Sequence, residues 1–84
     1  MIFIRNGKKY DTETAEQLCK EVMTENYYQN VLYKKRNCEF FITKEPYSGN
    51  TTIETFKNID EVKAWCEANL SGEDYISIFG DVEE

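Results

Sequence analysis

The chain has 84 residues, which is enough for one domain with a modest core and too few for two domains. It carries 16 acidic and 10 basic residues, a net charge of −6, and twelve aromatic residues, so it is predicted to fold and is no disordered acidic tail. No apolar run is long enough for a membrane span or a signal-peptide core, and we therefore expect a cytoplasmic protein without membrane contact.

The first predicted unit is a β-hairpin that leads into a helix. Asn6-Gly7 separates two short apolar-rich runs and favours a two-residue turn, which would place Phe3 opposite Tyr10. Asp11 or Thr12 can then cap a helix from Thr12 to about residue 25, because the apolar residues that follow recur at helical spacing. Residues 27–30 are interpreted as a polar, aromatic connection.

A second hairpin is predicted over residues 31–44, with Asn37 in the left-handed conformation at its turn. Phe40 and Ile42 would share one face, and Phe41 and Thr43 the other. A loop around the only proline precedes a further strand, residues 51–56.

Two helix starts follow. Asn58 with Glu61 three residues later forms a capping-box pattern, and Ser71 with Asp74 resembles a second cap. We therefore expect a helix with Trp65 in its core stripe, and a short C-terminal helix ending at Gly80, although residues 75–79 also alternate like a strand. The expected fold is a single α+β domain over residues 1–84: a small antiparallel sheet, formed by the N-terminal hairpin and about three further strands, packed with two main helices and the short C-terminal one. An acidic tail begins near residue 80.

The residue types needed for common enzyme chemistry are missing. The chain contains no histidine, its four glycines are isolated, and its carboxylates do not have the spacing of a calcium loop. Cys19, Cys38 and Cys66 lie far apart without a C-x-x-C motif, so buried free thiols are expected for Cys19 and Cys66, and a dimer linked through Cys38 is a minor alternative. We expect no enzyme, no cofactor and no metal.

Charge is unevenly distributed along the chain. Residues 1–38 hold seven basic and five acidic residues, whereas residues 39–84 hold three and eleven. This asymmetry is compatible with a soluble acidic domain and also with an acidic surface that binds a cationic partner.

Three segments resemble small acidic proteins carried by phages, plasmids and integrative elements of Gram-positive bacteria. Residues 6–15 match the N-G-K-x-Y-D-T-E-T-A motif of this family, residues 65–70 and 74–84 match W-x-E-x-x-L and D/E-Y-x-x-I-F-G-x-V-E-E, and residues 32–35 and 39–42 match more loosely. The glycine-rich loop of the family is replaced here by residues 44–49. Some members resemble anti-CRISPR proteins that block type II RNA-guided nucleases, so the resemblance implies a phage or mobile-element protein in the cytosol of a bacterial host.

The leading hypothesis is therefore a stoichiometric inhibitor of a bacterial defence nuclease that acts as a DNA mimic, a monomer or weak homodimer without direct nucleic-acid binding. The candidate partner-binding residues are Glu54, Glu61, Glu67, Glu73, Asp74, Asp81, Glu83 and Glu84, with Tyr27, Tyr28 and Tyr47 as anchors at the rim. One alternative is a nucleic-acid-binding regulator that uses Lys8, Lys9, Lys34, Lys35 and Arg36. Another is a plain interaction module that dimerises or pairs with a partner like an antitoxin.

Overall fold

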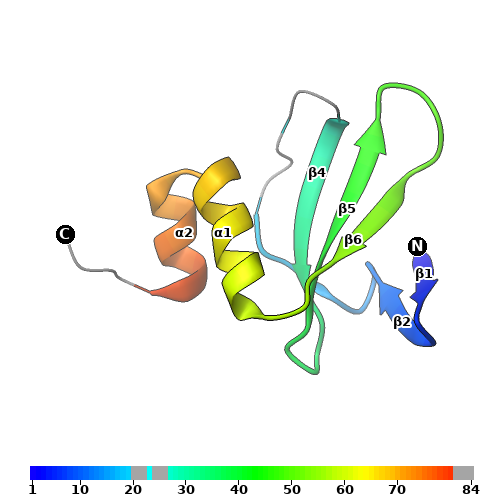
Figure 1. The fold of residues 1–84 in the computed structure, drawn as a ribbon, viewed down its shortest axis with the longest axis horizontal. Helices are drawn as coiled ribbons and strands as arrows, with labels where there is room; N and C mark the ends of the chain where they lie inside the picture. Colours follow the sequence, from blue (N-terminus) through cyan, green and yellow to red (C-terminus); the bar gives the residue numbers. More distant parts are fainter. Residues whose placement is uncertain (20–22, 24–26, 81–84) are drawn as a thin grey trace.

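A computed structural model describes residues 1–19, 23 and 27–80, and for Tyr27 and Tyr28 it describes the backbone only. The chain forms an α+β domain, as expected, and a short helix stands at the C-terminal end of the described part (Figure 1). Its strands form two antiparallel sheets rather than one, and it has two helices in the described residues. One sheet pairs β1 (Ile2–Arg5) with β2 (Lys8–Asp11). The other has the order β3 (Glu16–Gln17), β4 (Tyr27–Lys34), β5 (Phe40–Pro46) and β6 (Thr52–Thr55). The helices are α1 (Ile59–Asn69) and α2 (Gly72–Phe79).

The N-terminal hairpin has the predicted turn and register. Asn6 and Gly7 both have positive φ, at 52° and 74°, as a two-residue turn of this kind requires, and Phe3 pairs with Tyr10.

The helix predicted from Thr12 is wrong in the part that the structure describes. The Asp11 side chain accepts a hydrogen bond from the Glu13 backbone N–H (2.9 Å), and the Ala15 N–H donates to the Asp11 carbonyl (3.0 Å), which closes a single turn. The chain then extends as β3 along the edge of β4, where the Leu18 N–H donates to the Leu32 carbonyl (2.9 Å). Pairing with an open strand edge thus overrides the helical pattern. The end of the predicted helix lies outside the described residues.

The second hairpin is confirmed, with two differences. Strand β4 already begins at Tyr27, so the segment interpreted as a connection is part of the sheet. At the turn, Cys38 rather than Asn37 is left-handed (φ 71°). The Cys38 N–H donates to the Lys35 carbonyl (2.9 Å), which places Arg36 and Asn37 at the centre of a tight turn and Cys38 in the left-handed position that follows it.

Both faces of the four-stranded sheet are covered, so the molecule has three layers (Figure 1). On one face, Leu32 and Ile42 pack with Val62 and Cys66 of α1 in the main core cluster, which also includes Cys19. On the other face, the fully buried Phe41 ring stacks on Tyr33 (5.2 Å between ring centroids) and meets the edge of Tyr10 (5.3 Å). Phe40 and Phe41 therefore point to opposite faces of the sheet. Phe40 faces the layer formed by α1 and α2, the helix layer, and Phe41 faces the layer formed by the β1–β2 hairpin, the hairpin layer.

The two helices begin where the capping residues predicted. Asn58 Oδ1 accepts from the Glu61 N–H (3.0 Å), and Ser71 Oγ accepts from the Asp74 N–H (3.2 Å). Gly80 ends α2 with φ 90°, a conformation suited to glycine. Trp65 is half-buried and packs against the core cluster.

Candidate partner-binding surface

The helix layer is the most acidic part of the described structure. Residues 59–80 carry five carboxylates and one lysine, Lys63, whose ammonium lies 5.7 Å from the centre of the Phe79 ring. Four of these five carboxylates are candidate residues from the sequence, and all four are exposed: Glu61, Glu67, Glu73 and Asp74. The fifth carboxylate is Asp60.

Most of these carboxylates lie where they stabilise their own helix. Asp60 and Glu61 lie in the first turn of α1, and Glu73 and Asp74 in the first turn of α2, where the positive end of the helix dipole stabilises a negative charge by about 0.3–1 kcal/mol. Glu67 has no such position within its own helix, because it lies in the last turn of α1, where the dipole disfavours it.

Glu67 stands at the rim of an apolar groove between the helices. The groove has a volume of about 470 Å³ and is lined by Cys66, Glu67, Leu70, Ser71, Gly72, Tyr75 and Ile76. Ile76 is 42% exposed, although the solvent-facing side of a helix usually carries polar residues. Burial raises the pKa of the Tyr75 hydroxyl, and the nearby Glu67 carboxylate raises it further. The groove thus combines an apolar floor with a negative rim.

The other candidates lie elsewhere. Glu54 is on β6, where it forms an ion pair with Lys44, and Tyr47 is 67% exposed in the loop after β5. The backbone of Tyr27 and Tyr28 belongs to the start of β4. Asp81, Glu83 and Glu84 lie outside the described residues. Neither Glu54 nor Tyr47 lines the groove, so the structure does not join the candidates into one surface.

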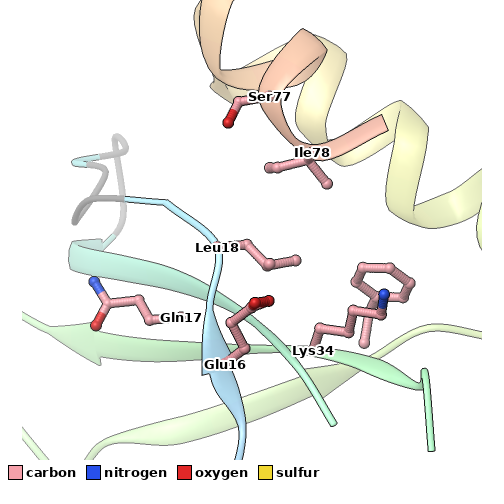
Figure 2. Close-up of a pocket in the computed structure, with 7 residues that line it drawn as sticks. Glu16, Gln17, Leu18, Lys34, Ser77 and Ile78 are labelled. Carbon is pink, nitrogen blue, oxygen red and sulfur yellow. The ribbon is translucent and has the colours of Figure 1, made fainter. Parts of the chain in front are cut away.

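A second depression, of about 350 Å³, lies between β3 and the end of α2. Figure 2 shows Glu16, Leu18 and Lys34 on the sheet side of it and Ser77 and Ile78 on the helix side. Sequence reasoning missed this site because it assigned residues 16–18 to a helix.

The thiols in the core are poorly suited to nucleophilic chemistry. Cys19 and Cys66 are buried free cysteines of the same core cluster. Burial raises the pKa of Cys66 to about 11, and the charges of Cys19 and Glu67 contribute; burial also raises the pKa of Cys19. Both therefore stay protonated at neutral pH, whereas the reactive form of cysteine is the thiolate.

The basic residues named from the sequence come together from two hairpins. Lys8 and Lys9 of β2 lie near Lys35 and Arg36 of the β4–β5 turn, and Glu39 joins the hairpins through Lys8 (3.1 Å) and Lys35 (3.4 Å). Lys34 instead lines the depression beside α2. The β1–β2 hairpin and the helices lie on opposite sides of the four-stranded sheet, so Lys8 and Lys9 are separated from the acidic helices (Figure 1).

Within the described residues, no three His, Cys, Asp or Glu side chains are arranged so that they could hold a metal ion. None of the described helices is long and apolar enough to span a membrane. Comparisons with protein-family models, curated proteins and solved structures find no match to the chain.

Proposed function

We propose that the protein is a non-catalytic inhibitor that binds a cationic protein through its helix layer, and that the partner is a bacterial RNA-guided defence nuclease. The observation that carries this proposal is the groove between α1 and α2, in which exposed Ile76 lies beside Glu67. An apolar anchor with a charged rim is the usual organisation of a protein interface. The family resemblance of residues 6–15, 65–70 and 74–84 supports the choice of partner.

The acidic helix layer would compete with nucleic acid for the partner. RNA-guided nucleases hold the guide–target duplex in a positively charged channel, largely through its phosphate backbone. Carboxylates on α1 and α2 would take the place of phosphates in that channel, while the groove accepts an apolar side chain of the nuclease. Binding of this kind needs no bond-making group on the inhibitor.

The test is DNA cleavage by a purified type II nuclease–guide complex at increasing inhibitor concentrations. Inhibition should be complete near equimolar inhibitor. Glu67→Lys combined with Ile76→Ser should raise the concentration needed by about tenfold or more, since it places a repulsive charge at the rim and removes the anchor. Glu67→Lys favours the helix dipole at the end of α1, so this variant should remain folded.

Glu45→Lys is the charge-matched control for Glu67→Lys, because Glu45 is exposed on β5 away from the groove. It should inhibit like the unchanged protein. Undiminished inhibition by the folded groove variant, or an equal loss in the Glu45 variant, would refute this binding surface. Absence of inhibition by the unchanged protein at large excess, across several type II nucleases, would refute the proposed partner.

A further inference from the structure

The junction of the two hairpins forms a recessed basic site. A notch of about 250 Å³ lies between the β1–β2 hairpin and the β4–β5 turn, and it is lined by Lys9, Asp11, Thr14, Lys35, Arg36 and Asn37. We propose that this notch binds the phosphate groups of a nucleic-acid backbone, with Lys9 and Arg36 as the principal contacts. The proposal does not depend on the function of the helix layer.

Packing holds the two walls of the notch together. Tyr10 is 5% exposed and lies edge-on to Phe41, which fixes β2 against the sheet. The Lys35 ammonium lies 4.3 Å from the centre of the same Tyr10 ring, on the side of the turn. Lys9 therefore stands beside Arg36 because of tertiary structure, although the two residues are far apart in sequence.

Two acidic residues near the notch, Glu39 and Asp11, already accept hydrogen bonds from other groups of the protein. Glu39 accepts from Lys8 and Lys35 and from the Asn37 side-chain amide (2.6 Å), and the Lys8 contact, followed by that of Asn37, holds the pKa of its carboxyl below the usual range. Asp11 is 9% exposed, and its Oδ1 accepts from the Glu13 N–H. The lysine contacts therefore offset the charge of Glu39, whereas the Asp11 carboxylate keeps its charge and is outnumbered in the lining of the notch by Lys9, Lys35 and Arg36.

Among the described residues, Lys9 and Arg36 are the cations of the site that have no ion-pair partner. Both are exposed. An Arg fork and a Lys ammonium on opposite walls suit phosphate oxygens, and the Thr14 hydroxyl and Asn37 amide add polar groups.

The shape of the site favours a strand of nucleic acid over a lipid surface. A bilayer of anionic lipids would place a broad negative plane against a protein of net charge −6, whereas a single strand can present its phosphates to the notch alone and leave the acidic helices on the other side of the sheet. Contacts to the backbone alone would bind without strong sequence preference.

Fluorescence anisotropy with a labelled single-stranded RNA of about 20 nucleotides tests this inference. With about two or three phosphates neutralised, affinity should fall about five- to tenfold when salt rises from about 50 to 150 mM. Lys9→Glu with Arg36→Glu should reduce binding by about tenfold or more. Lys57→Glu with Lys63→Glu gives the same net charge without touching the notch, and should retain affinity within about twofold. Circular dichroism establishes that both variants are folded.

Three results would overturn the inference. They are a flat titration of the unchanged protein at low salt, equal losses in the two double variants, and full displacement of the RNA by inorganic phosphate at constant ionic strength. The last would assign the notch to a free phosphate ion. Unchanged RNA binding in the presence of phosphate, together with loss in the Lys9/Arg36 variant alone, would support the nucleic-acid site.

Discussion

Replacing Phe41 with leucine should loosen the N-terminal hairpin from the rest of the fold. Phe41 is completely buried, and its ring makes two aromatic pairs, one with Tyr33 on the neighbouring strand and one with Tyr10 on the hairpin. Each such pair contributes about 0.5–1.5 kcal/mol beyond its buried area, so Phe41→Leu should lower the free energy of unfolding by about 1–3 kcal/mol. A domain of this size has roughly 4–12 kcal/mol in total, so the variant should still fold.

Urea denaturation measures the loss of stability, and amide hydrogen exchange locates it. Exchange should accelerate in β1 and β2 more than in α1, because Phe41 faces the hairpin and not the helices. Ile42→Val, on the helix face of the same strand, should cost about 0.5–1.5 kcal/mol without selective opening of the hairpin. A Phe41→Leu loss below about 0.5 kcal/mol, or uniform acceleration of exchange, would refute the three-layer packing.

Three further predictions concern the turn at residues 35–39 and the thiols. Cys38 has φ 71°, a left-handed conformation that glycine adopts without strain, so Cys38→Gly should raise the free energy of unfolding by about 0.5–1 kcal/mol. Asn37→Gly should lower the free energy of unfolding. Thermal melting of the two variants distinguishes these outcomes. The pKa of Glu39 is lowered in the folded state, so the ionised carboxylate stabilises the fold above its ordinary pKa of about 4.3. This stabilisation is lost as the pH falls through the lowered pKa of the folded state. In urea melts at successive pH values, the difference in the free energy of unfolding between the unchanged protein and Glu39→Gln should therefore shrink over that range. A thiol reagent at about pH 8 should label exposed Cys38 quickly and Cys19 and Cys66 only after unfolding, as counted by mass spectrometry.

Each of these predictions has a clear contrary result. Stabilisation by Asn37→Gly rather than Cys38→Gly would place the left-handed residue one position earlier. A pH-independent difference for Glu39→Gln would mean that its contacts with Lys8 and Lys35 do not favour the ionised form. Fast labelling of Cys66 in the folded protein would contradict its burial in the core.

Local signals in the sequence predicted the elements that depend on local chemistry. Asn6-Gly7 specified the turn and therefore the pairing of Phe3 with Tyr10, and the caps at Asn58 and Ser71 specified both helix starts. In each case the residues that decide the structure lie within a few positions of one another. The α+β class follows from these elements.

Elements whose structure depends on residues far away in the sequence could not be predicted from such local signals. Asp11 can cap either a helix or an isolated turn, and the open edge of β4 determines that residues 16–17 become a strand. The sequence likewise showed that Phe41 faces away from Phe40, but not that the N-terminal hairpin would cover it. This covering brings Lys9 to Arg36, so the basic notch is a product of tertiary packing.

The candidate binding residues follow the same division. Glu61, Glu67, Glu73 and Asp74 share the helix layer because their helices are adjacent, whereas Glu54 is on the sheet. Ile76 shares one helical face of α2 with Tyr75 and Phe79. Its exposure shows that no other described element covers this part of that face.

Hydrogen exchange of the protein bound to a nuclease–guide complex tests most directly whether the helix layer is the binding surface. We predict slower exchange at the end of α1 and across α2, residues 66–79, on complex formation, with the β5–β6 loop unchanged. Protection confined to that loop around Tyr47, or no protection anywhere at saturating nuclease, would contradict it.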